Sequence, residues 1–90
     1  MNASTSVSYF EALHLQKENK HSEAISMYES IIESNCANVG LFIRLGELYE
    51  SIQLKEKAIN TYKRGILLAQ KASNKKAERF LSYMLLGLIE

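Results

Sequence analysis

Two histidines and a glutamate near the N-terminus have the spacing that comes closest to a metal site. His14, Glu18 and His21 are separated by four and three residues, so they would share a face if one helix carried them all. A closed zinc site, however, needs four ligands in fixed geometry. We expect His21 to lie in a connection, with no second acidic ligand anchored nearby. The sequence therefore predicts no metal site and no cofactor.

The single cysteine, Cys36, is the only thiol that could act as a nucleophile. One cysteine excludes an internal disulfide and a multi-cysteine metal site. We expect no histidine on a rigid neighbour to activate it, and interpret it as a half-buried small apolar residue in a connection. The chain also lacks a glycine-rich phosphate loop and a Ser-His-Asp order with structural support. We expect no catalytic residues and a protein that is not an enzyme.

The composition favours a single small all-α domain. The chain has 90 residues, 47% of them hydrophobic, with four glycines and no proline. That length suits one domain, and the scarcity of turn residues disfavours a β fold. Apolar residues recur at helical spacing in five segments, which are 6–18, 22–34, 39–51, 55–72 and 75 to the end. The connections are short, so we expect neighbouring helices to pack antiparallel, with Asn19 ending the first and Asn38 capping the third.

The sequence repeats itself with a period of 34 residues. Shifting the chain by 34 superimposes Ala24 on Ala58, Ile25 on Ile59, Tyr28 on Tyr62 and Ile32 on Ile66. These identities share one helical face. A third unit begins later, because residues 42–46 recur as 83–87 after a shift of 41. A period of 34 residues over a helix hairpin is the tetratricopeptide spacing.

At these residues the chain resembles the tetratricopeptide repeat (TPR) family. The second unit matches best, through Phe42, Leu45, Gly46, Tyr49, Ala58, Tyr62 and Gly65, and both units lack the proline that closes the family's repeat. The resemblance implies antiparallel hairpins stacked as a right-handed superhelix, with repeats at about 5–38 and 39–72 and a partial third unit or capping helix at about 74–90, in one domain. It also implies a non-enzymatic scaffold that binds a protein or peptide in a concave groove lined by the first helices. We expect Gly46 and Ala12 where helices cross closely, with Tyr28 and Tyr62 as plugs between helices.

Six residues are the candidates for that groove. On the third helix, Ile43, Glu47 and Glu50 form a stripe about 80–140° from Phe42. The matching residues of the first helix are Tyr9, Leu13 and Gln16. By resemblance this stripe faces the groove, which would then favour basic or amide-rich ligands and would not suit the family's carboxylate clamp. The alternative is that Glu47 and Glu50 are simply solvated, as exposed helical carboxylates commonly are.

The charges are divided unevenly along the chain. Residues 1–50 hold three basic and seven acidic side chains, a net charge of −4, whereas residues 51–90 hold eight basic and three acidic ones, a net charge of +5. The basic residues Lys71, Lys75, Lys76 and Arg79 could form a phosphate patch for nucleic acid. Stacking aromatics are sparse there, and we expect Phe80 to be used in packing, so a nucleic acid partner is disfavoured. The opposite net charges of the two halves fit self-association or an acidic partner better.

The last helix predicts self-association. Eight of the ten residues from Phe80 to Ile89 are apolar, and they surround the helix. A helix that is apolar all round must be buried all round. We therefore expect a homodimer through Leu81, Met84, Leu85 and Leu88. Ten residues are too few to span a membrane, and the N-terminus does not read as a signal peptide, so we expect a soluble, cytoplasmic protein.

Overall fold

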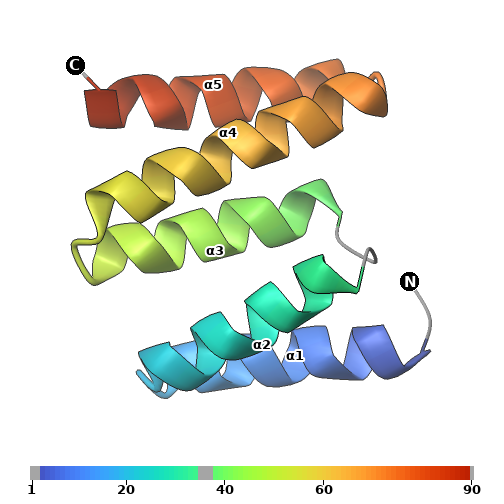
Figure 1. Ribbon diagram of the computed structural model, residues 1–90, viewed down its shortest axis with the longest axis vertical. Helices are drawn as coiled ribbons and strands as arrows, with labels where there is room; N and C mark the ends of the chain where they lie inside the picture. The colour runs from blue at the N-terminus through green and yellow to red at the C-terminus, as the bar shows by residue number, and fades with distance from the viewer. Residues whose placement is uncertain (1–2, 35–37, 90) are drawn as a thin grey trace. The chain divides into compact units, whose positions relative to one another are not determined.

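The computed structural model describes residues 3–34 and 38–89, which form five helices and no strand (Figure 1). The helices are α1 (Ala3–Lys17), α2 (His21–Glu33), α3 (Val39–Ser51), α4 (Lys55–Lys71) and α5 (Lys75–Ile89). The prediction of an all-α chain of antiparallel hairpins is confirmed. Helix α1 begins three residues earlier than the periodicity indicated, and Cys36 lies outside the described residues.

The chain divides into two compact units, Met1–Ala37 and Asn38–Glu90. The first unit contains the hairpin of α1 and α2, and the second contains α3, α4 and α5, with α4 packed against both neighbours. The boundary coincides with the start of the second repeat.

Three turns of one type join the helices within the units. Asn19, Gln53 and Ser73 stand at their centres with positive φ angles of 63°, 64° and 55°. In each turn the residue after the one with positive φ donates its N–H to the carbonyl of the residue five positions before it. Examples are Lys20 N to Leu15 O and Leu54 N to Tyr49 O, both at 2.9 Å. This is the Schellman arrangement, which ends one helix and reverses the chain. The prediction that Asn19 ends the first helix is confirmed, and its backbone there is left-handed.

Helix α3 begins at a side-chain cap. The Oδ1 atom of Asn38 accepts a hydrogen bond from Leu41 N at 3.1 Å, which satisfies one of the free amides of the first turn. Asn74 plays the same part for α5, accepting from Ala77 N at 3.1 Å. The prediction that Asn38 caps the third helix is confirmed.

The core of the first unit is small. Ala12 of α1 and Ala24 of α2 are fully buried, so the two helices meet through small side chains. Tyr28 is fully buried beside them, with its ring centroid 6.2 Å from that of Tyr9. The plug role predicted for Tyr28 is therefore confirmed.

The core of the second unit is larger and centres on two glycines. A Cβ on Gly46 of α3 would overlap the ring of Tyr62 from α4, with Cδ1 and Cζ at 2.7 Å. A Cβ on Gly65 of α4 would lie 2.9 Å from Phe42 Cβ and 3.1 Å from Leu81 Cδ1. Glycine at both sites lets the helices approach closely enough to bury Tyr62 and Leu81 completely.

Candidate interaction surfaces

The six groove candidates occupy equivalent positions in the two hairpins. A shift of 34 residues carries Tyr9, Leu13 and Gln16 of α1 onto Ile43, Glu47 and Glu50 of α3. All six side chains are half-buried. We call Tyr9, Leu13 and Gln16 the α1 strip, and Ile43, Glu47 and Glu50 the α3 strip. Each strip belongs to one unit.

A tyrosine from the second helix of each hairpin holds the last residue of each strip. The hydroxyl of Tyr28 donates to Gln16 Oε1 at 2.7 Å. The hydroxyl of Tyr62 donates to Glu50 Oε2. The two bonds join equivalent pairs, each separated by 12 residues along the chain. They fix the direction of the Gln16 amide and the Glu50 carboxylate at the surface.

The carboxylate in the second hairpin changes the chemistry of its tyrosine. Burial raises the pKa of Tyr62 far above its usual range, and the hydrogen bond to Glu50 together with the charges of Glu50 and Glu47 raises it further. Ionising the phenol would place two negative charges side by side in a partly desolvated site. Tyr62 therefore remains protonated, and a hydrogen-bond donor, throughout the physiological pH range.

Glu47 lies within the reach of one cation on its own helix. Arg44 Nη1 is 3.5 Å from Glu47 Oε1, and the two side chains are 53% and 41% exposed. An exposed pair of this kind contributes little to stability. A basic group of a ligand can replace Arg44 at modest cost, so this carboxylate remains usable for recognition.

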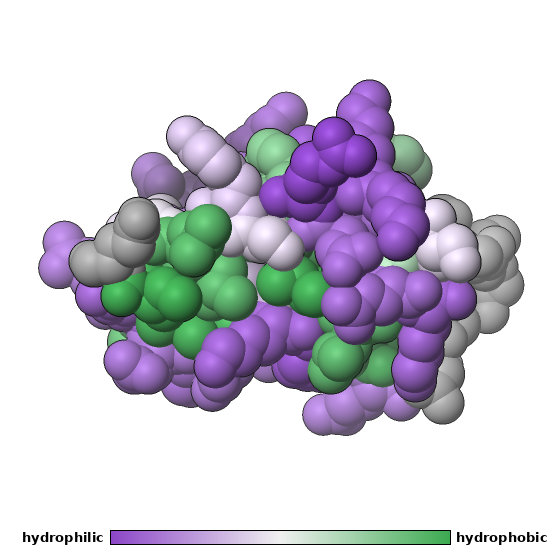
Figure 2. Space-filling view, turned by 90° about the horizontal axis from the view of Figure 1, so that it is seen from above, coloured by the Kyte–Doolittle hydropathy of each residue, from purple (hydrophilic) through white to green (hydrophobic). Residues whose placement is uncertain are grey.

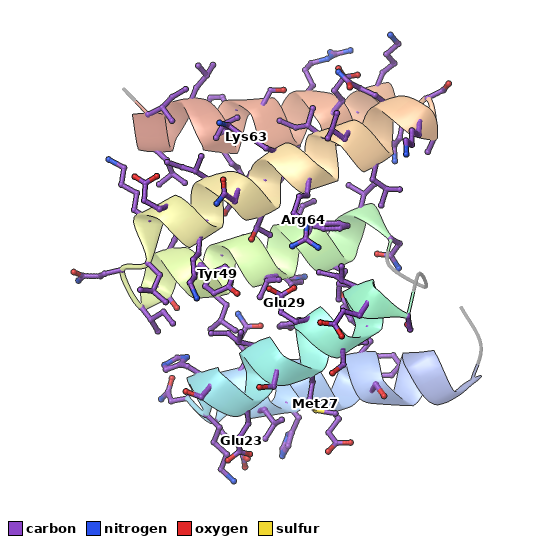
Figure 3. All side chains as sticks on the ribbon, viewed as in Figure 1. Glu23, Met27, Glu29, Tyr49, Lys63 and Arg64 are labelled. Carbon is purple, nitrogen blue, oxygen red and sulfur yellow. The ribbon has the colours of Figure 1, made fainter. Side chains whose placement is uncertain are left out.

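Two cations of α4 lie over aromatic rings of α3. The guanidinium carbon of Arg64 is 5.4 Å from the ring centroid of Phe42, and Lys57 Nζ is 5.8 Å from that of Tyr49. Figure 3 labels Arg64 on α4 and Tyr49 on α3. These distances are within the range of cation–π attraction, so part of the positive charge of the second unit serves hairpin packing.

The basic cluster at the α4–α5 turn also contains an acid. Glu78 Oε2 accepts a hydrogen bond from Gln70 Nε2 at 2.9 Å across the turn. Glu78 lines a shallow hollow together with Lys75, Arg79 and Ser82. Its carboxylate lowers the positive potential at the place where a phosphate would be bound. Phe80, expected to be used in packing, is instead 48% exposed.

Helix α5 divides its apolar residues between two faces. Of the four residues expected to self-associate, Leu81 is fully buried against Gly65, and Met84, Leu85 and Leu88 are half-buried. The expectation for Leu81 is corrected, because its side chain is already used inside its own unit. The exposed large apolar residues of α5 are Phe80, Tyr83, Leu86 and Ile89. Figure 2, which looks onto α5, shows hydrophobic surface gathered at one end of this view and hydrophilic surface over much of the other.

The histidines do not gather ligands around them. His14 Nε2 is 3.4 Å from Glu18 Oε2, on the exposed side of α1. His21 begins α2. Residues 3–34 and 38–89 contain no group of three or more His, Cys, Asp or Glu side chains placed to hold a metal ion. In the same residues, no helix combines the length and the apolar character needed to cross a bilayer.

No family model and no curated protein sequence matches the chain. Solved structures do. A solution NMR structure of a tetratricopeptide repeat domain protein from Salinibacter ruber matches with a TM-score of 0.87 and 28% sequence identity, over 94% of this chain and 86% of that one. A crystal structure of a tetratricopeptide repeat domain protein from the same organism matches with a TM-score of 0.81 and 28% identity, over 96% of this chain and 98% of that one.

Proposed function

We propose that this chain, which has the TPR-type fold that its sequence predicts, is a non-enzymatic module that binds a basic or amide-rich segment of another protein. The fold itself indicates a protein-interaction module in general. The finer proposal concerns which residues contact the partner and what chemistry that partner presents. We also propose that the protein is cytoplasmic, as expected from the sequence.

One observation carries the finer proposal, namely that the same strip recurs in both hairpins with its last side chain held by a tyrosine. Core residues of a hairpin are buried, and purely solvated residues need no fixed direction. Gln16 and Glu50 are neither, because each is half-buried and bonded to a buried tyrosine hydroxyl. Side chains held in one direction lose less entropy when a ligand binds.

The α3 strip defines the kind of ligand. Ile43 supplies apolar contact area, and Glu47 and Glu50 supply carboxylate oxygens one turn apart. The bond from Tyr62 engages one of the two Glu50 oxygens. Lys, Arg, Asn and Gln side chains, and backbone amides, donate to such oxygens, whereas an acidic segment would be repelled.

Selection from a display library of random peptides tests the proposal. We expect the wild-type protein to enrich peptides with Lys, Arg, Asn or Gln beside an apolar residue. Glu47→Lys should abolish that enrichment, because it places an ammonium group beside the Glu50 carboxylate and changes the net charge of the α3 strip from −2 to zero. Glu56→Lys is the matched control, since it makes the same charge change at an exposed position in the first turn of α4.

The outcomes separate the proposal from its alternative. Loss of enrichment in Glu47→Lys with retention in Glu56→Lys supports recognition by the α3 strip. If the wild-type protein and Glu47→Lys enrich the same peptides, Glu47 is only a solvated residue and the proposal fails. Enrichment of acidic peptides by the wild-type protein would contradict it equally.

A further inference from the structure

Three residues on α5 are the counterparts of three core residues on α3. A shift of 41 residues carries Phe42, Leu45 and Gly46 onto Tyr83, Leu86 and Gly87. On α3, Phe42 and Leu45 are 6% and 0% exposed, and Phe42 lies against Gly65 of α4. On α5, Tyr83 and Leu86 are 78% and 52% exposed. Phe80 precedes Tyr83 by three residues and Gly87 by seven, so it belongs to the same side of the helix. Together these residues form what we call the outer face of α5: Phe80, Tyr83, Leu86 and Gly87.

Gly87 marks a notch in this face. A Cβ on Gly46 would overlap the ring of Tyr62, whereas a Cβ on Gly87 would meet nothing within 4 Å. A glycine in a helix interior costs about 1 kcal/mol relative to alanine. On α3 that cost is offset by the close approach of a tyrosine ring. On α5 the same glycine stands beside open space.

The outer face contains both the notch and the side chain that fits it. Tyr83 lies four residues before Gly87, so it stands one turn away on the same side of the helix. If two α5 helices cross antiparallel about a two-fold axis near position 85, Tyr83 of each copy opposes Gly87 of the other. Each contact repeats the ring-on-glycine packing of Tyr62 on Gly46.

The charges of α5 permit this pairing and disfavour the parallel one. The basic residues of the exposed surface, Lys75, Lys76 and Arg79, all lie in the first half of the helix. In an antiparallel pair centred near position 85 the basic residues of the two copies lie at opposite ends of the interface and do not face one another. In a parallel pair they would face one another, and like charges in contact are unfavourable.

The apolar area is sufficient for a reversible dimer. Phe80, Tyr83 and Leu86 are each about half exposed or more. Together they present on the order of 400 Å² of surface in each copy, which doubles to about 800 Å² in a pair. Homodimer interfaces are about 65% apolar, so the total would be about 1,200 Å², the lower limit for specific interfaces.

We propose that the outer face of α5 docks against the same face of a second copy of this chain, with Tyr83 of each copy seated on Gly87 of the other. The contact is isologous, so each substitution in it acts twice. It uses α5 alone and does not depend on the α3 strip.

Sedimentation velocity across micromolar concentrations tests the proposal. We expect the wild-type protein to pass from monomer to dimer in this range. Tyr83→Ser should weaken the dimer at least about tenfold, as for an aromatic anchor of an interface. Gly87→Ala should weaken it similarly by filling the notch, and should raise the melting temperature of the diluted monomer because alanine favours the helix. Phe10→Ser is the control, since Phe10 is an aromatic residue 68% exposed on α1 of the other unit.

Several results would overturn the proposal. A wild-type protein that stays monomeric throughout the range would show that the outer face of α5 does not bind a second copy. A dimer that survives both Tyr83→Ser and Gly87→Ala would place the interface elsewhere. Dissociation by Phe10→Ser would place the interface on α1. A mass that keeps growing beyond the dimer would indicate a head-to-tail contact, which does not close.

Discussion

The ring of Tyr62 lies where the side chain of residue 46 would be, so Gly46 and Tyr62 together set the distance between α3 and α4. A Cβ at position 46 would have Tyr62 Cδ1 and Cζ at 2.7 Å. Tyr62 is fully buried and cannot rotate into solvent without leaving a void. The pair explains why a helix interior keeps a residue with poor helix propensity.

Gly46→Ala should therefore destabilise the second unit. The added methyl forces the Tyr62 ring or the α4 backbone to move, which typically costs about 1–3 kcal/mol and exceeds the gain of alanine in helix propensity. Denaturant unfolding measures the change. Gly87→Ala is the matched variant and should instead stabilise the monomer by roughly 0.5–1 kcal/mol, because its Cβ meets no neighbour. Equal effects of the two substitutions would contradict this packing.

Removing the tyrosine hydroxyls should affect the two hairpins differently. Tyr62→Phe keeps the buried ring and loses the bond to the Glu50 carboxylate, for which we expect a cost of about 1–2 kcal/mol, since Glu50 is half-exposed and regains water. Tyr28→Phe loses a bond to the neutral Gln16 amide and should cost about 0.5–1 kcal/mol. Chemical denaturation of the two variants, with circular dichroism as the readout, compares them. A larger loss in Tyr28→Phe would show that the charge of the acceptor does not matter here.

Most of the fold could be predicted because local patterns determine it. The identities at Tyr28/Tyr62 and Ala24/Ala58 gave the repeat, and Asn38 and Asn19 marked a helix start and a helix end. Each of these signals acts within a turn or two of the helix that it shapes, so tertiary packing did not overrule it.

The orientation of α5 could not be predicted, because apolar residues on all sides of a helix do not indicate which side is buried. What turns Leu81 inward and leaves Tyr83 outside is the space above Gly65 of α4, a contact between helices that periodicity does not contain. The bond between Tyr62 and Glu50 was missed for a similar reason. Its partners are 12 residues apart across a hairpin, outside the spacing of three or four that reveals neighbours on one helix.

Alkaline pH should destabilise the protein through Tyr62. Burial and the neighbouring Glu50 raise the pKa of Tyr62 in the folded state above that of the unfolded chain, which is about 10. As pH rises past that value the unfolded tyrosine ionises and the folded one does not. The free energy of unfolding then falls by up to about 1.4 kcal/mol per pH unit from this group. Denaturant titrations at increasing pH measure the slope for the wild-type protein.

Tyr62→Phe is the control for that slope. It removes the titrating group while keeping the ring in place, so its stability should fall less steeply above the ordinary tyrosine pKa. Ionisation of other groups contributes equally to both proteins and cancels in the difference. If the two slopes coincide, Tyr62 ionises as readily in the folded protein as in the unfolded chain.

The turn between α3 and α4 can be stabilised by one substitution. Gln53 holds a φ of 64° in an exposed position, and this left-handed conformation costs a non-glycine residue about 1–2 kcal/mol. Gln53→Gly removes that cost but adds freedom to the unfolded chain, so we expect a net gain of about 0.5–1 kcal/mol. Gln53→Ala, which keeps a Cβ, should give no gain, and thermal unfolding of both variants in one buffer compares them. Because Asn19 tolerates the same conformation better than Gln, Asn19→Gly should gain less. A gain in Gln53→Ala equal to that of Gln53→Gly would show that backbone strain at this turn is not the cause.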